Sequence, residues 1–181
     1  MWFGGFCLTK MTNNMNGLTD QEIEFLQQSN YIESEPGSEA LDDAVKAWQY
    51  IIAKPTLNLG RILQVHTLLM RSRITIENKY KGTLRTAPVW IGNREAPPYY
   101  VVPDLVKNFI EMTKGKSSGE PLEVWIKRCH IAFEHAHPFF DGNGRVGRIL
   151  LNWQRVKAGL PILVIREEDR FEYYKWFSSL A

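Results

Sequence analysis

Six stretches of this sequence carry apolar residues at a spacing of three to four, which is the period of an amphipathic α-helix. They cover residues 19–33, 41–53, 57–70, 105–112, 122–136 and 146–157. This pattern predicts a mostly α-helical fold. A chain of 181 residues with 44% hydrophobic content is suited to one compact domain with a buried core.

Residues 1–17 precede the first of these stretches, and we expect them to be a leader outside the fold, either disordered or the product of an upstream start. The opening residues are apolar, but they are too few for a signal peptide and lack its basic start. No segment approaches the roughly 20 apolar residues that a membrane span needs. The folded domain is therefore expected to occupy residues 18–181, with no association with a membrane.

Charge and cysteine content narrow the function further. The 22 basic and 20 acidic residues leave a net charge of +2, which predicts neither a nucleic-acid-binding stripe nor a membrane-binding face. Cys7 and Cys129 have no spacing typical of a disulfide framework or a zinc site, which fits a reducing cytosol. We therefore expect a cytoplasmic protein that binds no nucleic acid.

Two neighbouring helices are predicted to flank a short loop. The helix at 122–136 follows Pro121 and stops before Pro138, because a residue that precedes proline disfavours the helical conformation. The next helix is expected to bury a stripe of five residues, namely Val146, Ile149, Leu150, Trp153 and Val156. Arg145 and Arg148, one turn apart, would then share another face of this helix.

Residues 137–148 combine groups that suit a polyphosphate with its magnesium ion. His137 can accept a proton near neutral pH, and Asp141 offers a carboxylate oxygen to Mg²⁺. The glycine-framed segment 142–144 leads into the helix, so its backbone N–H groups are expected at a helix N-terminus, where phosphate is favoured. The side-chain amide of Asn143 is a further hydrogen-bond donor.

The other three histidines, His66, His130 and His135, lack such a setting and are expected to be core or surface residues. An alternative is that His135 and His137 chelate a transition metal, although no third ligand follows at a metal-site spacing. Phe139, which lies between the histidine and the aspartate of the loop, is expected to pin the loop into the core.

The segment at residues 82–92 carries β-branched and aromatic residues and is followed by Asn93, Pro97 and Pro98, which predicts an extended or hairpin structure. Pro88 places this segment at an edge, because proline cannot donate to a strand ladder. One interpretation is an ordinary surface hairpin. The other is an exposed edge that pairs with an extended peptide through main-chain hydrogen bonds.

The sequence His-Pro-Phe-Phe-Asp-Gly-Asn-Gly-Arg-Val-Gly-Arg at 137–148 resembles the signature of the Fic family (filamentation induced by cAMP). That signature is His-Pro-Phe-x-Asp/Glu-Gly-Asn-Gly-Arg-x-x-Arg, and every fixed position is met. The resemblance implies a single compact Fic-type helical domain with a small β-hairpin flap at 82–93 and a catalytic loop at 137–148. It also implies a protein adenylyltransferase, which transfers AMP from ATP to a hydroxyl side chain of a target protein and releases pyrophosphate.

The same resemblance implies roles for single residues. His137 is the catalytic base, Asp141 holds Mg²⁺, and Arg145 and Arg148 contact the β- and γ-phosphates of ATP. The flap positions the target protein and touches the nucleotide. The residues implied to bind ATP are Asp141, Gly142, Asn143, Gly144, Arg145, Val146, Gly147 and Arg148 around the loop, Val89, Trp90, Ile91 and Gly92 in the flap, and Tyr173 and Tyr174 near the C-terminus.

An inhibitory segment is implied at residues 19–35. The run from Ser29 to Glu33 resembles the inhibitory motif of the family, Ser/Thr-x-x-x-Glu followed by glycine or asparagine, although Ser34 stands at the last position. The resemblance implies that Glu33 pairs with Arg148 and withholds it from the γ-phosphate. In some relatives the same glutamate supports the removal of AMP, so the prediction includes a dual activity.

Two other functions stay open at this point. In the first, a Fic-type enzyme transfers UMP or phosphocholine instead of AMP. In the second, the domain is a nucleotide-binding regulatory module without significant turnover. A pure binder has no need for a base, so the presence of His137 favours an enzyme. Self-modification and homo-oligomerisation also stay open.

Overall fold

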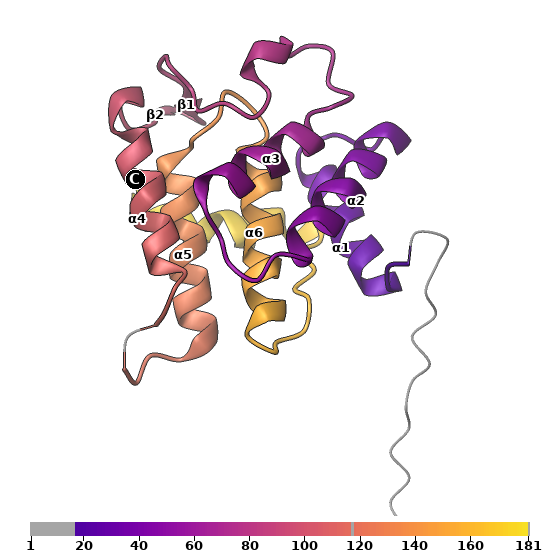
Figure 1. Ribbon diagram of the computed structural model, residues 1–181, viewed down its shortest axis with the longest axis vertical. Coiled ribbons are helices and arrows are strands. Elements are labelled where there is room, and N and C mark those ends of the chain that lie inside the picture. The colour runs from indigo at the N-terminus through magenta and orange to yellow at the C-terminus, as the bar shows by residue number, and fades with distance from the viewer. Residues whose placement is uncertain (1–16, 117, 181) are drawn as a thin grey trace, which may run out of the picture.

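The computed structural model describes residues 17–116 and 118–180 (Figure 1). Seven α-helices are present in this part of the chain, namely α1 (Asp20–Ile32), α2 (Ser38–Ile52), α3 (Leu59–Leu69), α4 (Val102–Met112), α5 (Leu122–Ala136), α6 (Asn143–Lys157) and α7 (Arg170–Tyr174). Four short 3₁₀ helices accompany them, namely η1 (Asn78–Tyr80), η2 (Tyr99–Val101), η3 (Glu167–Asp169) and η4 (Lys175–Leu180). The predicted mostly α-helical fold class is confirmed. The predicted leader lies outside the described residues, except for Gly17.

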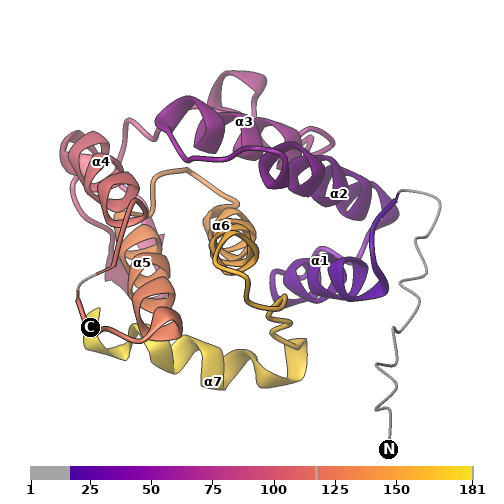
Figure 2. The same cartoon turned by 60° about the horizontal axis from the view of Figure 1, so that its bottom comes forward.

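Helix α6 lies at the centre of the domain, and the other long helices surround it (Figure 2). Twelve of its fifteen residues are buried. Four of the five residues predicted as its buried stripe are in the core, but Val156 is 37% exposed. The prediction for Val156 was wrong because this residue lies in the last turn, where Lys157 is exposed as well. Arg145 and Arg148 are buried too, so the face they share points into the protein.

Local signals at three helix ends position the site. At the start of α1, Thr19 Oγ1 accepts from the Glu22 N–H (3.2 Å) and Glu22 Oε2 accepts from the Thr19 N–H (2.8 Å), which is a capping box. Helix α5 begins after Pro121 and ends before His137, as predicted. Helix α6 begins at Asn143, three residues before its predicted start, because its first turn consists of polar residues and glycine and carries no apolar signal.

The two strands of the described residues, β1 (Trp90–Ile91) and β2 (Arg94–Glu95), form an antiparallel hairpin. Gly92 takes the first position of the turn with φ of 59°, a conformation that favours glycine. A hairpin is therefore present, as predicted, but its second strand lies beyond the predicted range 82–93. The first part of that range forms no strand, and the N–H of Arg85 instead donates to the Pro138 carbonyl (2.9 Å).

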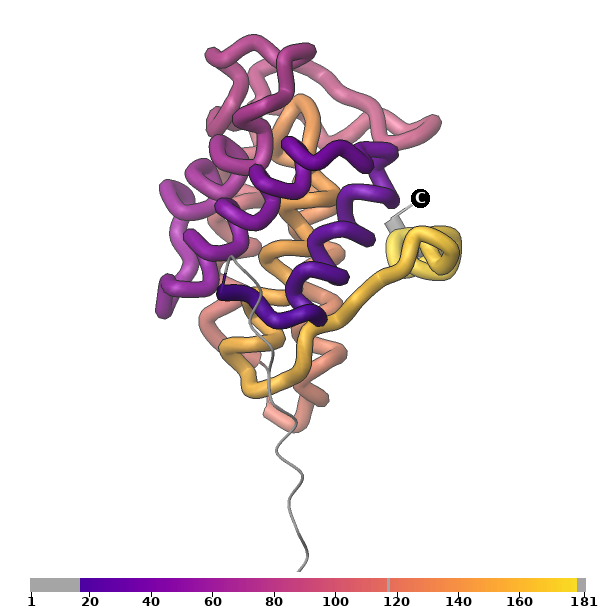
Figure 3. The backbone as a smooth tube through the Cα atoms, turned by 90° about the vertical axis from the view of Figure 1, so that its right-hand side faces the viewer, coloured from indigo at the N-terminus to yellow at the C-terminus, as the bar shows by residue number. Residues whose placement is uncertain are grey.

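The C-terminal segment runs along the outside of the domain beside α1 (Figure 3). The Glu167 N–H donates to Gln28 Oε1 (2.9 Å), and Arg166 pairs with Glu24 (2.7 Å). These contacts join η3 to α1. Among residues 17–116 and 118–180, no helix combines the length and the apolar composition that a membrane span requires.

Candidate active site

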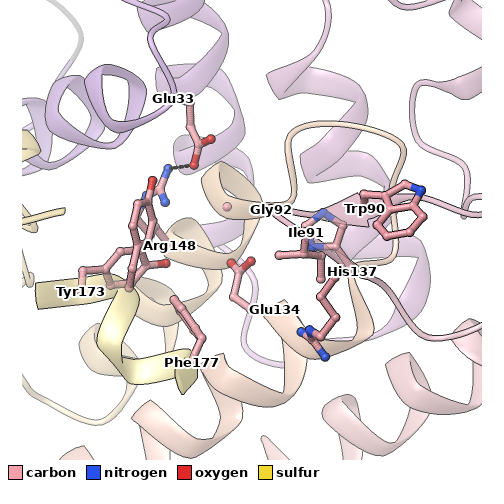
Figure 4. Close-up of a pocket in the computed structure, with 12 residues that line it drawn as sticks. Glu33, Trp90, Ile91, Gly92, Glu134, His137, Arg148, Tyr173 and Phe177 are labelled. Carbon is pink, nitrogen blue, oxygen red and sulfur yellow. Dashed lines mark hydrogen bonds and ion pairs between the residues drawn. The ribbon is translucent and has the colours of Figure 1, made fainter. Parts of the chain in front are cut away.

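A cavity of about 550 Å³ opens between the end of α1, the flap, α5, α6 and the C-terminal segment (Figure 4). Nine of the residues predicted from the sequence line it, namely Glu33, Trp90, Ile91, Gly92, His137, Gly144, Arg148, Tyr173 and Tyr174. Arg94, Glu134 and Phe177 line it as well and were not predicted. The structure therefore brings the loop, the flap and the predicted inhibitory segment to one place.

His137 is the residue that ends α5. Its backbone adopts the left-handed conformation (φ 43°, ψ 60°), which costs a residue other than glycine about 1–3 kcal/mol. Its N–H still donates to the Phe133 carbonyl (3.1 Å). Burial lowers the pKa of the imidazole to about 4, and the positive charges of Arg85 and Arg94 act in the same direction. The side chain is therefore neutral at physiological pH and able to accept a proton.

The loop after His137 is held by its own side chains. Asn143 Oδ1 accepts from the Phe139 N–H (2.8 Å), and Asn143 Nδ2 donates to the Phe139 carbonyl (2.9 Å). Phe139 is fully buried and stacks on His66 with ring centroids 3.8 Å apart, which confirms that it pins the loop into the core. The amide of Asn143, which we expected to be a phosphate donor, is thus engaged within the loop.

The N-terminus of α6 is built for close approach. Gly142 precedes the helix in the left-handed conformation (φ 77°), and its N–H donates to Asp141 Oδ1 (2.7 Å). A Cβ at Gly144 would clash with Glu33 Oε1, so the Glu33 carboxylate lies directly over the first turn of α6. The first N–H groups of a helix have no partner inside the helix and attract anions. In this structure, the Glu33 carboxylate already covers the N-terminus of α6.

Arg148 is 1% exposed and is bound by the end of α1. Its Nε donates to Ser29 Oγ (2.9 Å), and its Nη2 donates to the Ser29 carbonyl (2.9 Å) and to Glu33 Oε1 (2.7 Å). Figure 4 shows the Glu33 carboxylate meeting the guanidinium at the rim of the cavity. Arg148 Nη1 has no hydrogen-bond partner among the described residues, so one donor of this group is free for an anion.

Asp141 and Arg145 lie on the other side of the loop. The Asp141 side chain is 44% exposed, and its Oδ2 is 3.8 Å from Arg73 Nε. Arg73 in turn pairs with Glu35. Arg145 is 3% exposed, its Nη2 contacts the sulfur of Met70 (3.4 Å), and its Nε has no partner in the part of the chain that the structure describes. The exposed carboxylate and the unpartnered guanidinium donor fit a Mg²⁺-bound phosphate.

The remaining predicted residues do not line the cavity. Val146 is fully buried and its N–H donates to the Gly142 carbonyl, so neither group faces the cavity. A Cβ at Gly147 would clash with Glu134 Oε1, so this glycine makes room for the carboxyl group of α5. Val89 precedes β1, and its carbonyl accepts from the Ala96 N–H (2.9 Å). Its role is to close the base of the flap.

Among the lining residues that were not predicted, Glu134 has the most strongly altered ionisation. Burial raises the pKa of its carboxyl group to about 8, and the negative charge of Glu33 acts in the same direction, against the opposing charge of Arg148. The carboxyl group is therefore largely protonated at neutral pH. Glu134 stands in the last turn of α5, three residues before His137, and this nearness to the predicted base is the signal that could have identified it from the sequence.

His66 was predicted as a core or surface residue, and it is a buried residue that contacts the loop. Its Nδ1 accepts from the Gly82 N–H (2.8 Å), so Nε2 carries the proton and donates to the Asp141 carbonyl (3.1 Å). Burial lowers the pKa of His66 to about 4. His135 and His137 belong to no cluster of three or more histidine, cysteine or acidic residues within the described ranges.

The two predicted tyrosines differ in exposure. Tyr173 is buried, its hydroxyl group is 2.8 Å from His130 Nε2, and its ring lies 5.7 Å from the guanidinium carbon of Arg148. Tyr174 is 43% exposed. Tyr173 therefore supports Arg148 from below, whereas Tyr174 is the more open of the two towards the cavity.

The helical fold with its flap is that of solved Fic-domain structures. A Fic domain containing signaling protein from Bacteroides thetaiotaomicron matches with a TM-score of 0.74 and 17% identity, over 85% of this chain and 69% of that one. Fic-1 from C. elegans matches with a TM-score of 0.74 and 19% identity, over 86% and 54%. The chain belongs to the Fic/DOC family, because the family model matches residues 56–154, more than half of its length.

Related sequences carry the name of an activity. The "Protein adenylyltransferase Fic" of Drosophila grimshawi is 30% identical over 132 residues, which are 72% of this chain and 26% of that protein. The protein of the same name from Aedes aegypti is 29% identical over 122 residues, 66% of this chain and 24% of that protein. The chain thus spans about a quarter of the length of these relatives.

Proposed function

We propose that this protein is a Fic-type transferase that moves AMP from ATP to a hydroxyl side chain of a target protein. One observation carries the proposal: the neutral imidazole of His137, the buried guanidinium of Arg148 and the N-terminus of α6 face the same cavity. The names of the related sequences support it. The cavity then needs to place one hydroxyl group against one phosphorus atom.

His137 acts as the general base in this proposal. Its neutral ring accepts the proton of the target hydroxyl group while the hydroxyl oxygen forms a bond to the α-phosphorus. The bond between the α-phosphorus and the oxygen that bridges to the β-phosphate breaks, and pyrophosphate leaves. The products are the AMP-modified protein and pyrophosphate, and the proton remains on the imidazole until solvent removes it.

The phosphates are bound at the start of α6. The backbone N–H groups of the first turn and the guanidinium groups of Arg145 and Arg148 neutralise the negative charge that spreads over the phosphate oxygens. Asp141 would hold Mg²⁺, and the ion would polarise the phosphoryl oxygens. Tyr174, at the open side of the cavity, is placed to contact the base or ribose of the nucleotide.

Glu33 acts as an internal inhibitor. Its carboxylate takes the Arg148 donor and covers Gly144, which are the two places where a triphosphate must bind. A charge-assisted hydrogen bond of this kind contributes about 1.5–3 kcal/mol, which corresponds to about a ten- to hundredfold weaker binding of ATP. Release of the end of α1 would therefore activate the enzyme.

The target protein docks on the flap. Trp90 in β1 is 65% exposed, and the short hairpin offers free edges to an extended peptide. The protein can also serve as its own target, so the proposal includes self-modification. It also includes a homo-oligomer, whose formation would move the end of α1. We place this activity in the cytoplasm.

A second candidate is removal of AMP from a modified protein. The observation that favours it is the position of the Glu33 carboxylate in the same cavity as His137, where a carboxylate can orient a water molecule towards the phosphorus. In that case Glu33 inhibits the forward reaction and supports the reverse hydrolysis.

The test is transfer of α-labelled ATP, followed by measurement of the intact mass of the protein. We expect the Glu33→Gly variant to gain about 329 Da per AMP more readily than the wild type (on the order of ten- to a hundredfold faster). The added His137→Ala substitution should abolish the gain, and His135→Ala is the matched control that should retain it. Labelling that UTP or a choline donor supports instead of ATP would assign another transferred group, and no labelling in any variant would reject the proposal.

A further inference from the structure

Arg85 lies in the segment that precedes β1 and is 2% exposed. Within the described residues, every hydrogen bond of its side chain goes to a backbone carbonyl. Its Nε donates to the His137 carbonyl (2.8 Å), its Nη1 to Ala87 (3.3 Å) and its Nη2 to Pro97 (2.5 Å). Its backbone N–H donates to the Pro138 carbonyl (2.9 Å). One residue thus holds two consecutive carbonyls at the end of α5.

These contacts connect the flap with the base. Ala87 and Pro97 stand on either side of the hairpin β1–β2, so the guanidinium group holds both ends of the flap. Its third contact is the carbonyl of His137, the residue with the left-handed backbone. A conformation of that kind persists only where the surroundings restrain it. Arg85 therefore supplies the restraint and ties it to the element on which a target would dock.

The positive charge of Arg85 also acts on the His137 ring and lowers its pKa. Carbonyl oxygens satisfy the guanidinium donors but do not neutralise the charge, so a positive charge stays close to the imidazole. The other charged or titratable groups around His137 are Glu33 at the end of α1, Arg94 in β2 and Glu134 in α5. Arg85 and Arg94 favour the neutral ring, whereas Glu33 favours the protonated one.

We propose that Arg85 is the positioning residue of this site, which fixes the backbone of His137 and aligns the flap with it, so that the base and the incoming hydroxyl group are held in register. The inference rests on the proposed transfer. Among residues 17–116 and 118–180, the hydrogen bonds of the Arg85 side chain go to His137 and the flap and none goes to Gly144 or Arg148, so its effect falls on the chemical step and spares the binding of ATP.

The experiment compares Arg85→Lys and Arg85→Gln in the Glu33→Gly background, each at a temperature where circular dichroism shows the variant to be folded. Lysine keeps the charge but cannot reach three carbonyls, and glutamine loses the charge as well. We expect kcat to fall about 100-fold in both variants, with the KM for ATP changed less than about threefold. The matched control is Arg61→Lys, a surface arginine that also donates to a backbone carbonyl, of Thr56 (2.5 Å).

A second measurement needs no activity. Titration of the His137 ring by NMR should show a higher pKa in Arg85→Gln than in the parent, because the removed positive charge no longer opposes protonation of the ring. Arg85→Lys should stay closer to the parent. Faster hydrogen exchange at the Ala96 N–H, which closes the flap, is expected in both variants.

Full kcat in Arg85→Lys would overturn the inference, as would losses of kcat and ATP affinity of equal size. If the Glu33→Gly parent transfers no nucleotide at all, the proposed function fails by itself. The ring titration and the hydrogen exchange then decide the role of Arg85. An unchanged His137 pKa in Arg85→Gln, together with unchanged exchange in both variants, would reject it.

Discussion

Two buried guanidinium groups bind elements around the cavity, and their partners differ in kind. The side chain of Arg85 donates to three backbone carbonyls. Arg148 donates to the hydroxyl and carbonyl groups of Ser29 and, in addition, to the carboxylate of Glu33 at the end of α1. A carbonyl of the surrounding chain cannot leave its donor without local unfolding. A carboxylate at a helix end can be exchanged for another anion. We therefore expect the end of the site at His137, the proposed base, to be fixed, and the end at Arg148, where the proposed function places the phosphates, to be exchangeable.

The exposed fractions of the side chains involved fit this difference. Arg85 and Arg148 are equally buried, but the Glu33 side chain is 36% exposed and closes the last turn of α1. Ser34, which follows it, has a positive φ of 59°, so the chain turns sharply away from the helix at this point. A movement confined to the end of α1 would therefore release Arg148 from Glu33 while its hydrogen bonds to the buried Ser29 remain.

The largest effect is expected from the fixed end. In the Glu33→Gly background, His137→Ala should lower the rate of AMP transfer about 1,000-fold, because a positioned general base contributes about 10²–10⁴-fold. The melting temperature and the affinity for ATP should change little, since His137 holds no phosphate. A variant that loses ATP binding along with its rate would contradict the division into two ends.

The next largest effect concerns Glu33, whose removal should lower the stability of the protein although it raises the rate of transfer. Glu33→Gly should lower the free energy of unfolding by about 1–3 kcal/mol, because one donor of the buried Arg148 guanidinium loses its acceptor. Saturating ATP and Mg²⁺ should restore this loss, since bound nucleotide supplies a new acceptor. Thermal unfolding with and without nucleotide measures both. Equal stability of wild type and Glu33→Gly in the absence of nucleotide would show that the contact between Glu33 and Arg148 does not stabilise the protein.

Glu134 lines the cavity together with His137 and Arg148. The ionisation of its carboxyl group makes the stability of the protein depend on pH. The pKa of its carboxyl group is raised to about 8 in the folded protein, so folding takes up a proton between pH 4.5 and 8. The contribution of Glu134 to stability is complete below pH 4.5 and is lost as the pH rises through 8. Glu134→Gln keeps the neutral shape and should remove this loss.

The measurement for Glu134 is the difference in unfolding free energy between wild type and Glu134→Gln at pH 5, 6.5 and 8. The variant should gain on the wild type as the pH rises. The four histidines, His66, His130, His135 and His137, all have lowered pKa values, act in both proteins alike and cancel in the difference. A difference that does not change with pH would show that the carboxyl group is ionised in the folded protein.

The smallest effect is expected from the ion pair at the C-terminal end of the predicted inhibitory segment. Glu35 pairs with Arg73, whose Nε is 3.8 Å from Asp141 Oδ2. Both partners are partly exposed, so the pair contributes about 0.2–1 kcal/mol. Glu35→Gln should therefore tighten ATP binding less than about fivefold, and 0.5 M salt should reduce the effect. Glu111→Gln, in a remote surface pair, is the control, and a gain as large as that of Glu33→Gly would contradict the ranking.

Much of the fold followed from the sequence because its signals are local. Helix α5 matched its predicted bounds, since Pro121 and the His137-Pro138 step mark both ends. The start of α6 was missed because its first residues are polar or glycine. The burial of Arg145 and Arg148 was missed because periodicity reports one apolar face and cannot show that a helix is surrounded on all sides.

The site residues, too, could be predicted only where the sequence carries a local signal. A motif fixes the identity of His137, Glu33 and Arg148, so their side chains could be selected from the sequence. The contacts of Arg85 could not, because its acceptors are backbone carbonyls that carry no residue identity, and one of them lies 52 positions away. The engagement of the Asn143 amide with Phe139 was hidden for the same reason.

The most direct test of the exchange at Arg148 is calorimetric titration of Mg²⁺–ATP into wild-type protein and the Glu33→Gly variant at the same pH and salt concentration. The competition between carboxylate and phosphate predicts a dissociation constant that is about ten- to a hundredfold lower in the variant. Equal dissociation constants, or no heat of binding in either protein, would contradict the account.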